Sequence, residues 1–246
     1  MSVALPGSSL WLALALAMPL SLPQAAAAKD PAMPNVQPPT ALPFPAELQE
    51  LAQAVSAGDT EAIARLVPGA PVQLTGDDNV TLLEWAIWHR QPDALDALLR
   101  AGLDPALPGM DGESVAHLAA SVDDPRYLQI LIAHGAPVDL IGGRAARTPL
   151  FRAILSRRQQ QANLLLANGA DIHRSDAMGN TVLHVAAEVG DAARALELLV
   201  AGADPLATNH RGVRFDAVLL AGDDARLTAQ GQAARQAVRQ WLAEHR

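Results

Sequence analysis

The chain has 246 residues but contains no cysteine, and its aromatic residues make up only 3% of the sequence. The absence of cysteine excludes disulfide bonds, cysteine nucleophiles, thiolate metal sites and a lipid-modified cysteine. Half of the residues are apolar, so a core must be built mainly from alanine and leucine. Lys29 is the only lysine, and the formal net charge is -8. This charge argues against a nucleic acid or an anionic membrane surface as the partner.

The sequence also lacks recognisable catalytic motifs. We find no G-x-S-x-G element, no H-E-x-x-H element and no glycine-rich phosphate loop with its lysine. The seven histidines are spread over six segments of the chain. The run Asp77-Asp78-Asn79 is too short for a calcium loop and is typical of a turn. The sequence therefore predicts a protein that is not an enzyme and that has neither a cofactor nor a metal site.

The chain is dominated by a repeat whose interval is 33 residues, or once 34. Each copy predicts two short antiparallel helices, the first capped by a hydroxyl side chain and the second ended by a left-handed glycine. The capping positions are Thr81, Ser114, Thr148, Thr181 and Arg214. The helix-ending glycines are Gly69, Gly102, Gly135, Gly169 and Gly202. The paired apolar residues before them are Leu98-Leu99, Leu131-Ile132, Leu165-Leu166 and Leu198-Leu199.

Two segments carry a motif that resembles the T-P-L-H-x-A signature of ankyrin repeats. Residues 181–186 read T-V-L-H-V-A and residues 148–153 read T-P-L-F-R-A. The resemblance covers about residues 47–246. It implies an all-α fold, an ankyrin-repeat solenoid of about six helix-pair units with short finger turns. It also implies that His117 and His184 hydrogen-bond within and between repeat turns, while Glu84 and Phe151 occupy the same position in the other two repeats.

Three regions are expected along the chain. Residues 1–28 resemble a secretory signal, with an apolar run at 10–22 and cleavage after Ala28; the alternative is an uncleaved anchor or a mis-assigned start. Residues 29–45 are expected to form an extended, proline-rich linker. The ankyrin domain then covers 46–246. Its units are the N-terminal cap 46–78, the full repeats 79–111, 112–144, 145–178 and 179–211, and the C-terminal cap 212–246.

The two end units are expected to close the stack. In the first unit, Gly58-Asp59 marks the turn between two helices, and Ile63, Leu66 and Val67 are expected to face inward. The last unit departs from the repeat and predicts a longer helix over residues 228–244. Its apolar face, which should cover the end of the stack, consists of Val238, Trp241 and Leu242.

The finger turns and the exposed side of the first helices are the candidate partner-binding surface. The repeat register places Trp88 and His89 outward, where a tryptophan can anchor a partner; the alternative is that Trp88 packs against the first repeat or the linker. The same register places Trp85 inward. The candidate partner-binding residues are Trp88, His89, Asp78, Met110, Asp111, Arg144, Arg147, Met178, Asn180, His210 and Arg211.

The single 34-residue interval places one additional residue in the finger at residues 142–147. The adjacent glycines predict a mobile tip, and Arg144 and Arg147 make it locally basic. Such a tip can grip an acidic group of a partner. The alternative is that the insertion has no purpose, since loops tolerate insertions.

These features predict a monomeric, non-catalytic protein–protein interaction module in the bacterial periplasm or outside the cell, with no stable membrane anchor after signal cleavage. Residues 81–87 and 112–120 resemble bacterial ankyrin proteins encoded beside secreted toxins, including phospholipase effectors. That resemblance implies an immunity protein that occludes a toxin with its concave face. The alternative is an accessory or chaperone-like partner of a periplasmic enzyme such as a catalase. Delivery into host cells would need a secretion signal of another kind.

Overall fold

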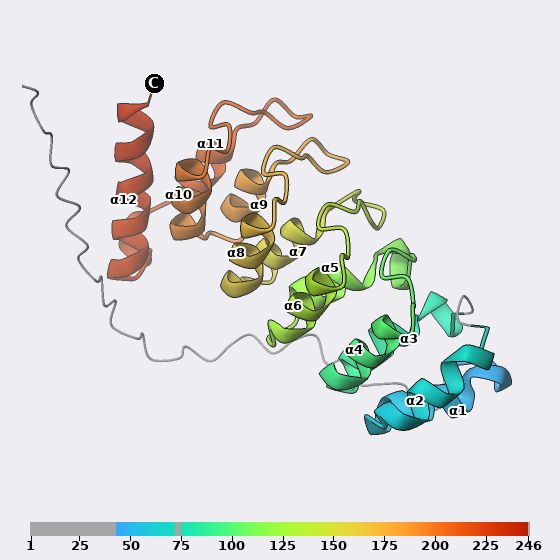
Figure 1. Cartoon of the computed structure of the whole chain (residues 1–246). Coiled ribbons are helices and arrows are strands. Elements are labelled where there is room, and N and C mark those ends of the chain that lie inside the picture. The colour runs from blue at the N-terminus through green and yellow to red at the C-terminus, as the bar shows by residue number, and fades with distance from the viewer. Residues whose placement is uncertain (1–42, 72–74, 246) are drawn as a thin grey trace, which may run out of the picture. The chain divides into compact units, whose positions relative to one another are not determined.

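The computed structural model describes residues 43–71 and 75–245, which lie within one compact unit spanning residues 37–246 (Figure 1). In this part of the chain the structure consists of helices and turns, with no strand. The predicted signal at residues 1–28 and residues 29–42 of the predicted linker lie outside the described residues. Among the residues that are described, no helix combines the length and the apolar character needed to cross a bilayer.

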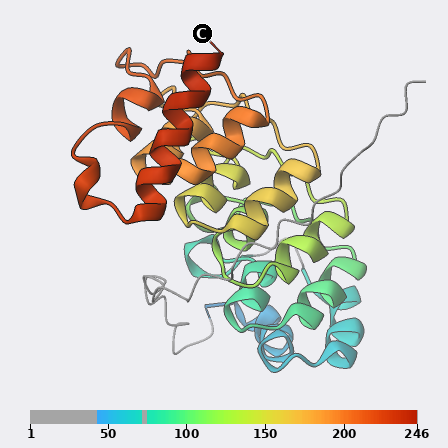
Figure 2. The ribbon, with the colours of Figure 1, turned by 90° about the vertical axis from the view of Figure 1, so that its left-hand side faces the viewer.

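The helices form antiparallel pairs, and successive pairs lie side by side in a row (Figures 1 and 2). The pairs are α1 (Ala46–Ala57) with α2 (Thr60–Leu66), α3 (Leu82–Trp88) with α4 (Pro92–Arg100), α5 (Val115–Ser121) with α6 (Arg126–Ala133), α7 (Pro149–Leu155) with α8 (Gln159–Ala167), and α9 (Val182–Glu188) with α10 (Ala192–Val200). The last unit differs: α11 (Phe215–Leu219) packs against α9, and α12 (Ala229–Glu244) packs against α10. The first helices α1, α3, α5, α7, α9 and α11 each contact the next one in the row. This arrangement confirms the predicted all-α ankyrin solenoid.

The helix boundaries follow from the repeat pattern. Thr81 caps α3 through its hydroxyl, which accepts the amide N–H of Glu84 at 3.1 Å, and the Glu84 carboxylate accepts the N–H of Thr81 at 2.8 Å. The glycines that end the second helices are left-handed, with φ from 77° at Gly135 to 100° at Gly202. Gly69 is the exception, because α2 tightens into the 3-10 turn η1 (Val67–Gly69) and the glycine does not reach positive φ. The prediction of a left-handed Gly69 is therefore wrong.

The core runs through all the pairs and consists mainly of small aliphatic side chains. The first leucine of each predicted apolar pair is fully buried. These leucines are Leu98, Leu131, Leu165 and Leu198. Burial of each such side chain contributes about 1.5–3 kcal/mol. Since each side chain lies between two helix pairs, the stability of one pair depends on its neighbours.

The two ends of the row are closed as the sequence predicts, with one extension. At the C-terminal end Val238 is fully buried, and α12 packs against α10 (Figure 2). At the N-terminal end the Phe44 ring lies edge-on to Trp85 with a centroid distance of 5.4 Å, and the Pro43 carbonyl accepts the N–H of Asp77 at 2.6 Å. Residues 43–45 therefore belong to the folded unit and not to an extended linker, because Phe44 is buried and its ring packs against Trp85 of α3.

Candidate protein-binding face

From the finger of Gly112 onward, each finger is connected to the next by a backbone hydrogen bond. The N–H of Gly143 donates to the Gly112 carbonyl at 3.1 Å, that of Ala177 to Ala145 at 2.8 Å, and that of His210 to Met178 at 3.0 Å. The fingers project on one side of the helix row (Figure 1). We call this side, with the adjacent first helices, the finger face.

Two histidines attach fingers to helices, as the sequence predicts. The Nδ1 atom of His117 accepts the Ser114 N–H at 3.1 Å, and its Nε2 lies 2.9 Å from the carbonyl oxygen of Arg147 in the next finger. His184 repeats the arrangement with the carbonyl of Val213 at 2.9 Å. Because Nδ1 of His117 is an acceptor, the neutral ring carries its proton on Nε2. Burial lowers the pKa of His117 and so favours this neutral form.

Glu84 performs the same connection with a carboxylate. Besides capping α3, it accepts the N–H of Met110 at 3.2 Å and so holds the finger η3 (Met110–Gly112). Its side chain is almost fully buried, and this burial raises its pKa even though the hydrogen bonds from Thr81 and Met110 favour the ionised form. Gly109 lies against the carboxylate so closely that a Cβ atom at this position would overlap it.

Phe151 occupies the position that Glu84, His117 and His184 fill in the other repeats, but its side chain cannot form hydrogen bonds. In this repeat an ion pair connects the finger to its neighbour instead. The Phe151 ring is fully buried, and the buried hydroxyl of Thr148 has no partner among the described residues. The Arg147 guanidinium instead reaches Asp176 in the following finger at 3.0 Å. Burial alone would raise the pKa of Asp176, but hydrogen bonds from Asn180, from the Met178 N–H and from Arg147 outweigh it and hold the pKa below its usual value. Arg147, predicted to meet a partner, is thus engaged within the chain.

Most of the other predicted binding residues lie at fingertips. Asp78 and Asp111 are exposed at left-handed positions, with φ of 55° and 54°. Arg144, His210, Arg211 and Met178 are exposed as well. Met110 and Asn180 are half-buried. The Asn180 side chain links neighbouring fingers, because its Oδ1 accepts from Asn209 at 2.9 Å.

Trp88 and His89, predicted to point outward, are only partly exposed, and the Trp88 ring packs against the core. Both side chains are half-buried, and both rings contact Trp85. The His89 ring centroid lies 4.3 Å from that of Trp85, and burial lowers the pKa of His89. Trp85 faces inward as expected, and its indole N–H donates to Ser56 at 2.8 Å. The aromatic cluster at this end of the row recruits both residues, so partner binding by Trp88 and His89 stays a prediction.

The finger at residues 142–147 is packed, which contradicts the prediction of a mobile glycine tip. Gly142 is buried, and a Cβ atom there would lie 2.9 Å from the Cα of Glu113 and 2.9 Å from the ring of His117. The backbone of Gly142 also pairs with that of Arg147. Glycine is present here because the finger approaches its neighbour closely. Arg144 remains exposed on this finger.

A hollow of about 150 Å³ opens on the finger face beside η3 and α5. Its lining residues are Glu84, Met110, Asp111, Glu113, Ser114, Leu118, Ser121 and Arg152. The Nε atom of Arg152 lies 2.9 Å from both carboxylate oxygens of Glu113. This ion pair was not predicted from the sequence. One signal was present, since Arg152 occupies the repeat position that Trp85 and Val185 fill with apolar side chains.

The repeated helix pairs, capping boxes, left-handed glycines and linked fingers define an ankyrin-repeat protein, a protein–protein interaction module. The ankyrin-repeat family matches residues 101–176 as three copies and residues 178–210 as a single repeat. The matched part of the chain therefore consists of ankyrin repeats. Within the described residues, no group of three histidine, aspartate or glutamate side chains is placed to hold a metal ion.

Several known proteins are similar to the chain. Protein PhlB of Serratia liquefaciens is 45% identical over 139 residues, which is 56% of this chain and 61% of PhlB. The NF-kappa-B inhibitor cactus of Drosophila melanogaster is 40% identical over 81 residues, or 32% of this chain and 16% of cactus. The chain therefore spans less than two thirds of the length of these relatives.

A solved structure has the same fold. It is that of the predatory endopeptidase Bd0816 from Bdellovibrio bacteriovorus in complex with immunity protein Bd3460. The match has a TM-score of 0.63 at 24% identity and covers 78% of this chain and 97% of the matched chain. At this identity the likeness establishes the fold alone.

Proposed function

We propose that the chain is an exported immunity protein that binds a secreted toxin through its finger face and has no catalytic role of its own. The observation that carries the proposal is the linked row of fingers, whose backbone is held by hydrogen bonds while the tip side chains point to solvent. A surface that is fixed before binding loses less conformational entropy when a partner docks. The tips are therefore suited to a large protein surface.

Two likenesses support the immunity role. The fold matches a structure in which an immunity protein is bound to an endopeptidase. The resemblance of residues 81–87 and 112–120 to ankyrin proteins encoded beside phospholipase effectors favours such an effector as the toxin. Export rests on the apolar run at residues 10–22 and on a composition without cysteine, which folds without oxidative assistance.

Co-expression with the toxins encoded beside the gene tests the proposal. The full chain should relieve the growth arrest that one of these toxins causes, and the purified pair should form a complex. Arg144→Ala combined with Met178→Ala removes two exposed tip side chains and should weaken the complex about tenfold, which corresponds to about 0.7 kcal/mol for each side chain. The matched control is Val200→Ala with Leu206→Ala, which removes side chains that are 71% and 67% exposed elsewhere.

Three results would contradict the proposal. Growth arrest by every neighbouring toxin could persist in the presence of the chain, or the tip and control variants could bind equally well. Alternatively, the chain could bind a periplasmic enzyme such as a catalase and raise its yield of active enzyme, which would establish an accessory role. Trp88→Ala is not a clean test of binding, because Trp88 packs against Trp85 and its loss should also lower stability.

A further inference from the structure

The charges of the fingertips are ordered along the row. The two fingers nearest the N-terminus expose acidic side chains, and these are Asp77, Asp78 and Asp111. The later fingers expose basic side chains at Arg144 and Arg211. None of these five side chains forms an ion pair with a residue that the structure describes.

Three ion pairs neutralise charges at the bases of the fingers, while Glu84, at the acidic end, forms no ion pair with a described residue. Arg147 pairs with Asp176, Arg152 with Glu113, and Arg214 with Asp216. A docked partner therefore experiences little net electric field from these paired charges. The net field of the finger face comes from the tips, negative at one end and positive at the other.

Asp111 and Arg211 are too far apart to act on the same small group, whereas Arg144 lies on the finger next to that of Asp111. Adjacent packed helices lie about 8–10 Å apart, so the three repeat steps from the finger of Asp111 to that of Arg211 span about 25–30 Å. This distance exceeds the screening length of about 8 Å at physiological ionic strength, so each end attracts its own part of a partner. The hydrogen bonds between fingers hold the two ends at a fixed separation.

We propose that the finger face docks a folded protein that carries a basic patch and an acidic patch about 25–30 Å apart, in the order opposite to the finger charges. The inference rests on the proposed function, in which this face binds a protein, and adds the charge pattern of that protein. At the acidic end, the hollow beside Asp111 offers Met110 and Leu118 to the aliphatic stem of a partner lysine or arginine. Its charged head then lies near Asp111.

A second copy of this chain is the competing occupant, because an antiparallel pair would also match acidic tips with basic tips. The net charge of -8 on each copy opposes this pairing. A different protein that carries a basic patch need not have this net negative charge, so the repulsion between whole molecules need not arise. The observations therefore favour a different protein.

Two synthetic peptides test the two ends separately, acetyl-octalysine amide and acetyl-octaglutamate amide. Titrated into the isotope-labelled chain, octalysine should shift the amide resonances of residues 77–79 and 110–112, and octaglutamate those near Arg144 and Arg211. Raising the salt concentration from 20 to 150 mM should weaken both interactions. Shifts by both peptides at the same residues would overturn the proposal.

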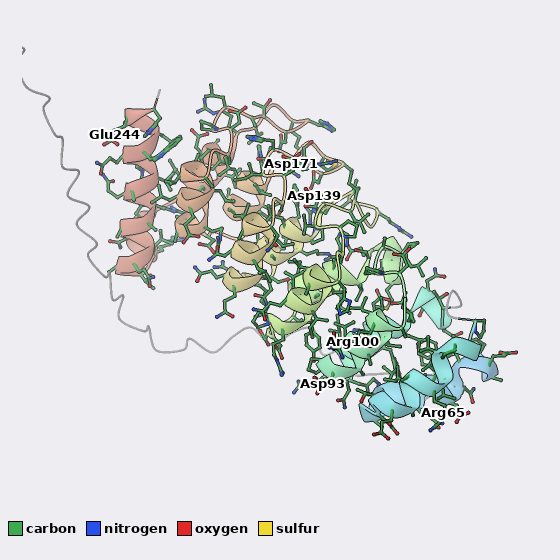
Figure 3. All side chains as sticks on the ribbon, viewed as in Figure 1. Arg65, Asp93, Arg100, Asp139, Asp171 and Glu244 are labelled. Atoms are coloured by element: carbon green, nitrogen blue, oxygen red, sulfur yellow. The ribbon has the colours of Figure 1, made fainter. Side chains whose placement is uncertain are left out.

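Matched variants separate the finger charges from the overall charge. Asp78→Asn with Asp111→Asn should weaken octalysine binding about threefold to tenfold, because exposed ion pairs contribute about 0.2–1 kcal/mol each and asparagine tolerates positive φ. Glu47→Gln with Glu50→Gln changes the net charge equally on the exposed side of α1 and should have little effect. For octaglutamate the finger variant is Arg144→Gln with Arg211→Gln, which should weaken binding. Its control is Arg65→Gln with Arg226→Gln, which should have little effect; Arg65 lies on α2 (Figure 3). Equal losses in finger and control variants would overturn the proposal.

Two further measurements complete the test. A salt-sensitive dimer in sedimentation, lost in the finger variants, would show that the occupant is a second copy and would refute the proposal. With a toxin in hand, binding that is insensitive to both finger variants would refute the charge order and leave the immunity role standing. Absence of any toxin partner would refute the immunity role, while the peptide titrations would still report on the fingertips.

Discussion

Replacing Gly109 by alanine tests how closely the second finger lies over Glu84. A Cβ atom at residue 109 would overlap the Glu84 carboxylate, which is 2% exposed and has little room to move. Gly109 has a φ of -100°, outside the left-handed range that favours glycine. The expected cost of Gly109→Ala is therefore mainly steric.

The size of the effect follows from the hydrogen bonds of the carboxylate. Displacing it would break one or two of the bonds from Thr81 and Met110, which lie at 2.8 and 3.2 Å. Each hydrogen bond to a charged group contributes about 1.5–3 kcal/mol, and alanine regains about 0.4–1 kcal/mol through the unfolded chain. We expect a net destabilisation of about 2–4 kcal/mol in urea denaturation followed by circular dichroism. Gly69→Ala is the control and should be neutral or slightly stabilising, because nothing lies within 4 Å of its added Cβ.

A double-mutant cycle separates the clash from any other effect of the alanine. In a Glu84→Ala background the carboxylate is absent, so Gly109→Ala should cost less than about 0.5 kcal/mol. The coupling energy between the two positions should then be at least about 1.5 kcal/mol. Additive effects of the two substitutions would show that the finger does not lie against Glu84, and the proposed attachment of the finger through this carboxylate would be wrong.

Two further predictions concern the stack and its histidine links. Leu165→Asp should abolish cooperative folding of the middle repeats, because a charge at this fully buried position has no partner. The control Val200→Asp, at a position that is 71% exposed, should change stability by less than about 0.5 kcal/mol. Identical thermal melts of the two variants would refute the assigned core. The lowered pKa of His117 predicts that stability falls as the pH drops below about 6.5, since the unfolded chain then binds a proton that the folded chain binds less readily. His117→Phe, which copies the residue at position 151, should reduce this pH dependence in urea melts at pH 5 and 7 and lower stability at pH 7 by about 1–3 kcal/mol; an unchanged pH dependence would contradict the link.

Much of the fold could be predicted from the sequence because the repeat leaves few alternatives. A helix pair of this size cannot bury its own apolar face, so a 33-residue period with a constant glycine register requires stacking. The positions of Leu98, Leu131, Leu165 and Leu198 in that register identified the core before any coordinates. The same register explains why the roles of His117 and His184 were predicted correctly from the motif position.

The features that the sequence did not reveal depend on contacts between distant residues. Arg152 and Glu113 are separated by 39 residues and meet only after two repeats have stacked. The burial of Phe44 depends on the ring of Trp85, and this aromatic cluster also changes the exposure of Trp88. For Gly142, local reasoning predicted mobility, although the residue is glycine because another finger lies against it.

In this repeat, the side chains that hold the fingers in place are different from the tip side chains that are available to a partner. A histidine, a carboxylate and an ion pair perform this attachment in different repeats, through His117, Glu84 and the pair Arg147–Asp176. Glu84, His117 and Asp176 are buried, so these contacts fix the finger backbone without involving the tip side chains. The tip residues Asp111 and Arg144 make no ion pair with any described residue. Substitutions at the tips can therefore change the charge pattern offered to a partner at little cost in stability, whereas substitutions at the attachment positions change stability first.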